Sequence, residues 1–411
     1  MKRRHSAPCE IVSRQRSQHD QALNGSQKGN STMRKIWSTD EVMQFATSRR
    51  SFLGGATALA GGAMLAPFIP NLAHAGSGDL QIMAWEGWEL TDELADWISK
   101  NNLNVEVSAM GNQDDVTTKF SVPNPPPFDA AEYNQGYADL YLDVLKITTP
   151  LDKSKLPNYS ADNLFDVFYD KPTWFRNGEL HGVPYAWGLN TIVYNPKMME
   201  KPTSYEDLLK PELKGKIVLV DDTLVTWPVA AVLAGFKTFP NLTKEEMAKT
   251  FEHLKLYRDQ ARTISLTYGD VVSLMVSGEV AACFAGWTGI PTETAKQNVE
   301  TIYTIPKEGA ATWCDAWFMP PGADNEEAAY EFFNQAISPE VQAKVVTRNA
   351  AGVVSSKAVD LLPPETKALF DYSDVEGIFK AAPLLGIPPL ESNQHATYAD
   401  WVAAWNEFKA G

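Results

Sequence analysis

The chain has 411 residues, of which 44% are hydrophobic, and a formal net charge of -15 from 51 acidic and 36 basic residues. At roughly 100 to 200 residues per domain this length predicts two to four folding units, and the apolar content excludes a disordered or fibrous protein. Since an acidic surface repels phosphate groups, we expect neither a nucleic acid nor an anionic membrane as partner.

Residues 1–75 have the pattern of an export leader and are excluded from the fold prediction. The pair Arg49-Arg50 precedes an apolar stretch rich in glycine and alanine, and Ala73-His74-Ala75 follows that stretch. This pattern resembles a twin-arginine signal cleaved near Ala75, and it predicts a location in the periplasm. A membrane anchor is the alternative, but glycines and prolines interrupt the apolar stretch.

Beyond the leader, short apolar runs alternate with segments of helical spacing. In chain order they predict a strand at 79–85, a helix at 89–100, strands at 104–107 and 128–131, helices at 138–146 and 204–209, a strand at 216–220, helices at 244–261 and 268–277, strands at 280–284 and 300–305, and helices at 325–336 and 398–409. This alternation is typical of α/β layers. The length left after the leader exceeds one layer set, so we expect two lobes.

The common catalytic and metal-binding patterns are missing from the sequence. The histidines beyond the leader are few and scattered, and no CxxC, G-x-S-x-G, P-loop or dinucleotide motif occurs. We therefore expect no metal, no cofactor and no enzymatic activity, with an exported cofactor-dependent enzyme as the alternative. Cys283 and Cys314 either form a disulfide in the oxidising compartment or are buried free thiols.

Tryptophans stand beside carboxylates or glycines at several predicted strand ends. Trp85 is followed by Glu86, Trp287 lies between Gly286 and Thr288, and Asp315 follows Trp313 by two positions. In open α/β sheets, ligands bind outside the carboxyl ends of the strands. An aromatic face with a nearby carboxylate suits an ammonium group, which the ring and the negative charge both attract. The sequence therefore predicts a site for a small amine.

Seven segments follow one another in a characteristic order between Leu80 and Gly411. They are Ala84-Trp85-Glu86-Gly87-Trp88, Phe128-Asp129, Pro184-Tyr185-Ala186-Trp187-Gly188, the run 214–222, Ser277-Gly278-Glu279-Val280, Pro306-Lys307-Glu308-Gly309 and Trp313-Cys314-Asp315. With this order and spacing the chain resembles the periplasmic solute-binding proteins of polyamine-type ABC importers, the spermidine/putrescine-binding family.

The resemblance implies an α/β, two-lobed periplasmic binding protein fold (type II-like), in which each lobe is a mixed sheet flanked by helices and the ligand cleft lies at the hinge. Lobe 1 would comprise residues 76–188 and 314–361, and lobe 2 residues 189–313 and 362–411. It also implies a monomer that captures a small amine, such as putrescine or spermidine, and delivers it to a membrane permease.

Position by position, the resemblance predicts eight ligand-binding residues: Trp85, Glu86, Trp88, Asn134, Asp222, Trp287, Trp313 and Asp315. Asp222 and Asp315 would hold amino groups, the tryptophans would form walls, and Asn134 would stand in place of a small hydroxyl residue. Val225 stands where the family has a second carboxylate, whereas Glu86 adds one in the first lobe. These departures favour a ligand shorter than spermidine, or one with an amine at one end only.

Each assignment has a structural alternative. Asp315 can cap a turn, Asp222 can cap the helix that follows it, and Glu86 can be a solvated surface acid. Trp187 and Trp227 are expected to pack at the lobe interface. The alternative ligands are an ω-amino acid of the 4-aminobutyrate type or a betaine, whose carboxylate would need an arginine or backbone amides as partner.

Overall fold

The computed structural model describes residues 78–85, 87–110, 113–222, 225–382 and 386–411. The predicted twin-arginine signal, its cleavage site near Ala75 and the predicted ligand residue Glu86 lie outside these ranges and stay predictions. Within the described ranges, no helix combines the length and the hydropathy that spanning a bilayer requires.

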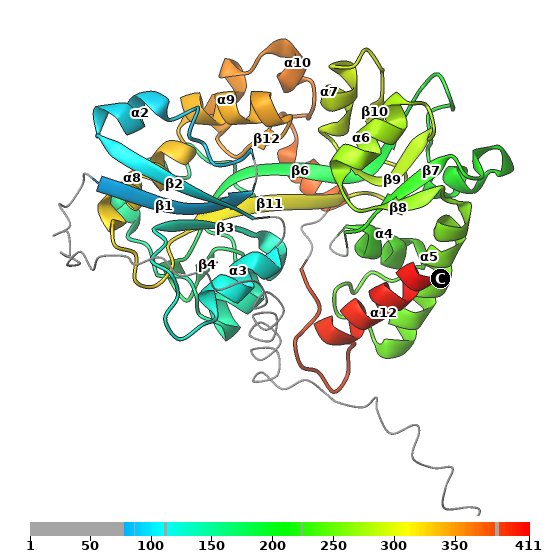
Figure 1. The fold of residues 1–411 in the computed structure, drawn as a ribbon, viewed down its shortest axis with the longest axis horizontal. Coiled ribbons are helices and arrows are strands. Elements are labelled where there is room, and N and C mark those ends of the chain that lie inside the picture. Colours follow the sequence, from blue (N-terminus) through cyan, green and yellow to red (C-terminus); the bar gives the residue numbers. More distant parts are fainter. Residues whose placement is uncertain (1–77, 86, 111–112, 223–224, 383–385) are drawn as a thin grey trace, which may run out of the picture. The chain divides into compact units, whose positions relative to one another are not determined.

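A mixed sheet of ten strands runs through the described part of the chain (Figure 1). Its strands are β1 (Gly78–Trp85), β2 (Leu103–Met110), β3 (Ala130–Asn134), β6 (Val183–Tyr194), β7 (Ile217–Val220), β8 (Thr263–Ser265), β9 (Ala282–Trp287), β10 (Ile302–Thr304), β11 (Ala311–Phe318) and β12 (Gly352–Val353). The order is β2-β1-β3-β11-β6-β9-β7-β8, and β10 and β12 also pair with β6. β4 (Phe175–Arg176) and β5 (Glu179–Leu180) form a separate pair. The predicted α/β class is confirmed.

The α-helices lie on either side of this sheet (Figure 1). They are α2 (Ala95–Lys100), α3 (Gln113–Phe120), α4 (Thr226–Leu233), α5 (Lys244–Gln260), α6 (Tyr268–Val276), α7 (Ile290–Ala295), α8 (Glu326–Ala336), α9 (Pro339–Asn349), α10 (Pro364–Lys367), α11 (Val375–Ala381) and α12 (Tyr398–Ala410). Short 3₁₀ or π turns occur at Gln135–Tyr137, Asp139–Val144, Lys153–Lys155, Tyr205–Leu209, Pro211–Leu213 and Ser356–Leu361.

The predicted helix at 89–100 is wrong over its first half. The helix α2 begins only at Ala95, because Leu90 has a φ of 60° and the residues between are turns. Leu90 and Leu94 are nevertheless buried. The apolar spacing therefore predicted correctly which side chains face the core, but not the backbone conformation that brings them there.

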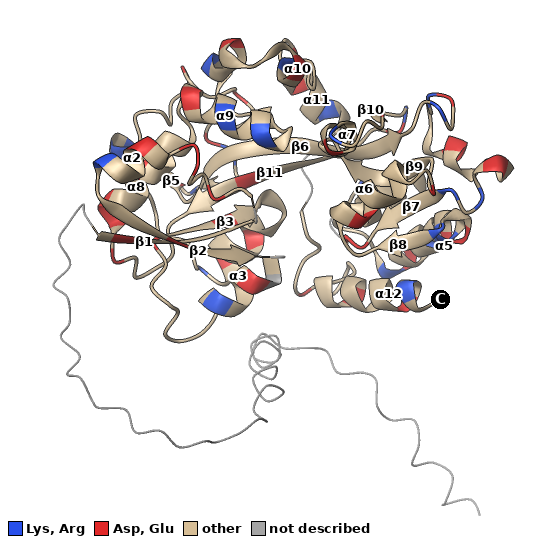
Figure 2. Cartoon of the chain, turned by 45° about the horizontal axis from the view of Figure 1, so that its top comes forward, with Lys and Arg blue, Asp and Glu red and all other residues tan. Residues whose placement is uncertain are grey.

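The strand β6 crosses the centre of the sheet, and the sequence did not predict it. All 12 of its residues are buried, and it pairs antiparallel with β11 and β9. The strand carries no charge, whereas charged residues lie mostly on helices and loops (Figure 2). Since the sheet continues past Gly188, the division into lobes at 76–188 plus 314–361 and 189–313 plus 362–411 stays a prediction.

Both ends of the sheet are parallel and the middle is antiparallel. β1 runs parallel to β2 and β3, and β7 runs parallel to β8 and β9. A small core of its own lies between β7, β9 and α6, with Val218, Val271 and Met275 among its members. This arrangement agrees with the predicted flanking of each mixed sheet by helices.

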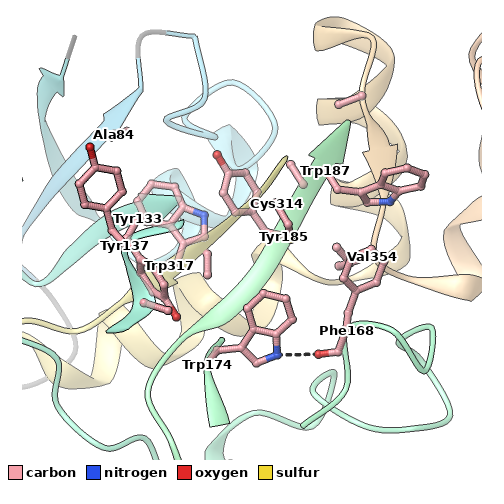
Figure 3. Packing of buried hydrophobic residues seen from close by; sticks show 14 of the residues in the cluster. Ala84, Tyr133, Tyr137, Phe168, Trp174, Tyr185, Trp187, Cys314, Trp317 and Val354 are labelled. Carbon is pink, nitrogen blue, oxygen red and sulfur yellow. Dashed lines mark hydrogen bonds between the residues drawn. The ribbon is translucent and has the colours of Figure 1, made fainter. Parts of the chain in front are cut away.

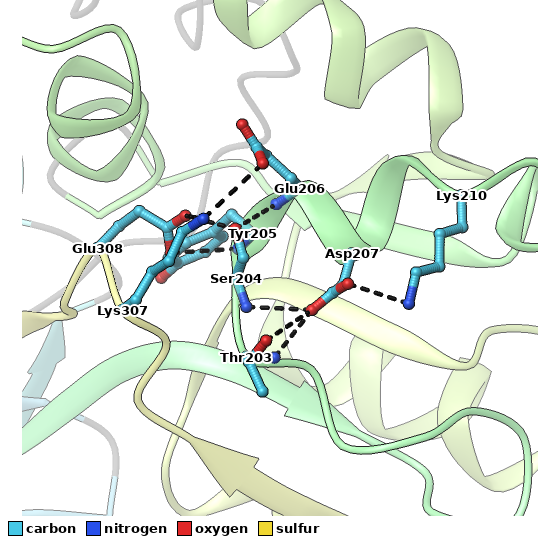
Figure 4. Close-up of polar contacts among 8 residues, drawn as sticks. All are labelled: Thr203, Ser204, Tyr205, Glu206, Asp207, Lys210, Lys307 and Glu308. Atoms are coloured by element: carbon cyan, nitrogen blue, oxygen red, sulfur yellow. Dashed lines mark hydrogen bonds and ion pairs between the residues drawn. The ribbon is translucent and has the colours of Figure 1, made fainter.

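Polar contacts fix the segment 203–210 to the chain just before β11 (Figure 4). The Asp207 carboxylate accepts from the backbone amides of Thr203 and Ser204 at 2.9 and 3.1 Å, and these bonds, together with the Lys210 ammonium group at 3.0 Å, hold its pKa at about 2. The Ser204 hydroxyl donates to Glu308, and so does the Tyr205 amide, at 3.4 Å. The bonds to Glu308 join the turn at Tyr205–Leu209 to the loop that precedes β11.

The C-terminal helix α12 packs on the β7 end of the sheet. Trp401 and Trp405 are both buried, as their helical spacing predicted, and the Trp401 ring lies 5.4 Å from that of Trp227. Cys283 on β9 and Cys314 on β11 are buried free thiols, so the disulfide alternative is wrong for this structure.

Candidate functional site

Asp315 lies inside β11, opposite Asn134 on β3. It is only 7% exposed, and its Oδ1 accepts a hydrogen bond from Asn134 Nδ2 at 2.9 Å. Asn134 Oδ1 in turn accepts from the Gly136 amide at 3.0 Å, which fixes the orientation of the side-chain amide. The turn-cap alternative for Asp315 is therefore wrong, and Asn134 acts on this carboxyl group directly.

Burial raises the pKa of Asp315 to about 7, and the hydrogen bond from Asn134 lowers it only in part. Among the described residues, no positively charged side chain counters this rise in the pKa of Asp315. A buried carboxylate without a cation is unfavourable, so below about pH 7 the carboxyl group of Asp315 holds a proton when the site is empty.

Glu132, which the sequence analysis missed, shares this face of the sheet. It lies two residues before Asn134 on β3, and successive side chains of a strand alternate between faces. Glu132 is fully buried, and its Oε2 accepts from the Tyr185 hydroxyl at 2.7 Å. Its pKa is raised well above the usual range by burial and then by the charge of Asp315.

A β-bulge brings Tyr185 to Glu132. The pairing of β6 with β11 shifts by one residue between Asp315 and Ala316, so that Tyr185 lies in the register gap. Its ring lies 5.4 Å from that of Trp317, the residue opposite Glu132 on β11 (Figure 3). A bulge changes the face to which a side chain points, which explains why simple alternation along β6 does not predict this contact.

Two of the predicted tryptophans stand together beside Asp315. Trp88, in the loop after β1, meets Trp313 edge-on at 5.8 Å and Tyr185 at 6.1 Å between ring centroids. The Trp313 ring lies over Gly188, where an added Cβ would be 2.6 Å from the indole. Gly188 is therefore required for the position of this aromatic wall.

Further predicted residues form a second cluster along β6. Trp287 on β9 pairs with Asn190, whose side-chain amide donates to the Tyr268 hydroxyl at 2.8 Å. The Tyr268 ring lies 6.4 Å from Trp287, and burial, followed by the charge of Asp222, raises the pKa of Tyr268. Because Asn190 is two residues from Gly188 on the same strand, this cluster lies on the sheet face that carries Trp313.

Asp222 and Trp85 lie at the margins of these clusters. Asp222 follows β7, and its backbone carbonyl accepts hydrogen bonds from the amides of Val225 and Thr226. Val225 is the N-cap residue of α4, and no side chain caps this helix. Trp85 ends β1, its indole Nε1 is buried without a hydrogen-bond partner among the described residues, and its nearby backbone amide lowers the pKa of Glu132 in part.

Two other tryptophans belong to the core. Trp187 is fully buried and donates through Nε1 to the Val353 carbonyl at 2.8 Å, with its ring over Gly352. Trp227 on α4 packs against Phe251 and α12. Both are packed in the core, and their predicted place at a lobe interface stays a prediction.

The described residues offer no group of three or more His, Cys, Asp or Glu side chains arranged to hold a metal ion. Two cavities lie away from the predicted ligand residues. One of about 50 Å³ is lined by Tyr205, Val229 and Glu308, and one of about 880 Å³ lies between α2 and α8. The chemistry on the shared sheet face is therefore that of buried carboxyl groups among aromatic rings.

Comparison with known proteins agrees with this fold. A family model described as bacterial extracellular solute-binding protein matches residues 94–369. The spermidine/putrescine-binding periplasmic protein of Escherichia coli is 29% identical over 260 residues, which cover 60% of this chain and 72% of that protein. That of Salmonella typhimurium is 26% identical over 316 residues, covering 75% and 88%.

Among solved structures, the spermidine/putrescine ABC transporter substrate-binding protein PotD of Streptococcus pneumoniae superposes with a TM-score of 0.66 at 22% identity. The match covers 81% of this chain and 100% of that one. These findings confirm the resemblance inferred from the sequence and the two-lobed periplasmic binding protein fold. They also confirm the expectation that the chain is related to binding proteins and not to enzymes.

Proposed function

We propose, since this chain belongs to the family of bacterial extracellular solute-binding proteins, that it is the substrate-binding component of an ABC importer for a small amine of the putrescine or spermidine kind. Its relatives in Escherichia coli and Salmonella typhimurium are named as spermidine/putrescine-binding periplasmic proteins. The protein would act in the periplasm, as a monomer, and deliver its ligand to a membrane permease without chemical change.

The buried pair Asp315 and Glu132 is the observation that supports an amine most directly. Both carboxyl groups lie on one face of the sheet, and burial raises the pKa of each. A cation that entered this site would supply the missing positive partner and donate charge-assisted hydrogen bonds to the carboxylate oxygens. An anionic ligand would add repulsion to groups that are already short of counter-charge.

The aromatic rings suit the same ligand. Trp88 and Trp313 meet edge-on beside Asp315, and an ammonium group over an aromatic face gains about 0.5 to 2 kcal/mol. We assign Trp85 and Glu86 to the same end of the ligand. The far end would be held by Trp287, which ends β9 opposite Asn190 of β6, and by Asp222, which follows β7.

Calorimetry with the purified mature chain tests this function. Titration with putrescine, spermidine, 4-aminobutyrate and glycine betaine should give saturable binding of at least one polyamine and tighter binding of polyamines than of the two zwitterions. A ligand at a hundredfold excess over its Kd should also stabilise the protein by about 2.7 kcal/mol. Tighter binding of 4-aminobutyrate or betaine would reassign the ligand, and no binding of any of the four would refute the proposal.

The export route has its own test. Replacing Arg49-Arg50 by Lys-Lys should leave the precursor in the cytoplasm when the chain is produced in a bacterium with a twin-arginine pathway. Fractionation followed by mass determination of the periplasmic form would also locate the cleavage site. Unchanged secretion of the variant would argue against this pathway.

A further inference from the structure

Glu132 carries a carboxylate oxygen that has no partner. The side chain is fully buried on β3, and its Oε2 accepts from the Tyr185 hydroxyl at 2.7 Å. Its Oε1 is sealed from solvent and finds no hydrogen-bond partner among the described residues. Buried acceptors in folded proteins are almost always paired, so an unpaired carboxylate oxygen beside a binding site points to a partner that comes from outside the chain.

Asp315 lies close to Glu132 across the strand pair. Asp315 is opposite Asn134, and Glu132 is two residues away on the same strand and face, which makes the two acids diagonal neighbours. Such neighbours lie roughly 7 Å apart at the backbone, a separation that two carboxyl side chains can close around one nitrogen atom. The charged or titratable side chains that the described residues place around Glu132 are Asp315, Glu89 and Tyr185, none of which can carry a positive charge.

We propose that Glu132 is the second acceptor for one ammonium group of the ligand, and that it restricts the site to ammonium ions carrying at least two N–H bonds. One N–H would donate to Asp315 and another to Oε1 of Glu132, while Tyr185 holds Oε2. This inference rests on the proposed function, and it names the chemical class of the ligand end bound in the first cluster.

The rejection of other cations follows from the same geometry. A quaternary ammonium ion has no N–H to donate, so it would leave both buried carboxylates without a hydrogen bond. A site whose buried acceptors need such a bond discriminates strongly against a ligand that cannot form it. Since Oε1 is sealed in this structure, the ligand reaches it only if the rings of the site separate. Trp88 and Trp313 are only partly buried, whereas Tyr185 is fully buried.

Calorimetry with two probes tests the inference: putrescine, and its analogue with a trimethylammonium group at each end. The wild-type chain should bind putrescine at least a hundredfold more tightly than the analogue. Glu132→Gln should weaken putrescine binding at least tenfold and analogue binding less than threefold. It should also reduce the number of protons released on binding, measured in two buffers of different ionisation enthalpy. Glu308→Gln, a partly buried acid outside both clusters, is the control and should change neither value.

The outcomes separate the two proposals. A wild-type chain that binds neither putrescine nor spermidine refutes the proposed function. A wild-type chain that binds putrescine while Glu132→Gln binds it equally well overturns this inference and leaves the function standing. If Glu132→Gln does not fold, Tyr185→Phe provides a second test of the inference. Loss of the hydroxyl donor should shift the pH of half-maximal putrescine affinity upward. An unchanged pH profile would count against a role of Glu132 in binding.

Discussion

Asp315→Asn separates the charge of the candidate site from its packing. Burial raises the pKa of Asp315 to about 7 in the empty protein, while an aspartate in the unfolded chain titrates near roughly 4. Between these values the folded state holds a proton that the unfolded state has lost, so stability falls as the pH rises through this range. Three pKa units correspond to about 4 kcal/mol of lost stability above pH 7.

The variant should not lose this part of its stability. An asparagine at this position retains an oxygen that can accept from Asn134, so the existing hydrogen bond can persist. Relative to wild type, the free energy of unfolding of the ligand-free variant should therefore rise by up to about 4 kcal/mol between pH 4 and pH 8. Urea unfolding at pH 4, 5, 6, 7 and 8 measures this difference directly.

Ligand binding should change in the opposite direction. At pH 8 the wild-type carboxylate is ionised, and its loss in Asp315→Asn should weaken putrescine binding by about 2 kcal/mol or more, roughly thirtyfold. At pH 5 the wild type must first lose a proton two units below its pKa, which costs about 2.7 kcal/mol, or roughly a hundredfold in affinity. The variant should lack that part of the pH dependence.

Two results would refute this reasoning about Asp315. The first is a stability difference between variant and wild type that stays flat from pH 4 to pH 8, which would mean that the carboxyl group titrates normally in the folded protein. The second is a putrescine affinity at pH 8 that Asp315→Asn leaves unchanged, which would remove this carboxylate from the ligand.

Three further expectations concern the surroundings of the site. Gly188→Ala would place a Cβ 2.6 Å from the Trp313 indole, so the ring must shift, with a loss of about 1 to 3 kcal/mol in stability and weaker putrescine binding; calorimetry showing wild-type affinity would contradict this. Trp405→Phe removes the 2.7 Å hydrogen bond from Nε1 to Asp221, which should lower the free energy of unfolding by about 1 kcal/mol in urea titrations. The buried Cys283 thiol, whose pKa burial raises to about 12, should resist iodoacetamide at pH 8 until the chain is unfolded, and labelling of the native protein within minutes would argue against its burial.

Local sequence patterns were sufficient for much of the fold. The helices α5, α6, α8 and α12 and the strands β1 and β7 lie within a few residues of their predicted positions, because each buries a single face or a short apolar run. The strand β6 was missed because its 12 residues are all buried and include Pro184, Gly188 and Asn190, so neither alternation nor a clean apolar run marks it. A strand that is buried on both faces forms because neighbouring strands pair with it, and these neighbours are distant in the sequence.

The sequence by itself showed indole rings close to acids, and the structure pairs Trp88 with Trp313 and Asn134 with Asp315, although Trp313 and Asp315 lie inside β11 and not at a strand end. Only the tertiary structure decided which carboxyl group stands beside Asp315. Glu132 lies in an ordinary Ala-Ala-Glu-Tyr run, and its meeting with Tyr185 depends on a bulge in β6 and on the register of β11 against β3. Register is a property of paired strands distant in the chain, and a shift of one residue would turn every side chain to the opposite face.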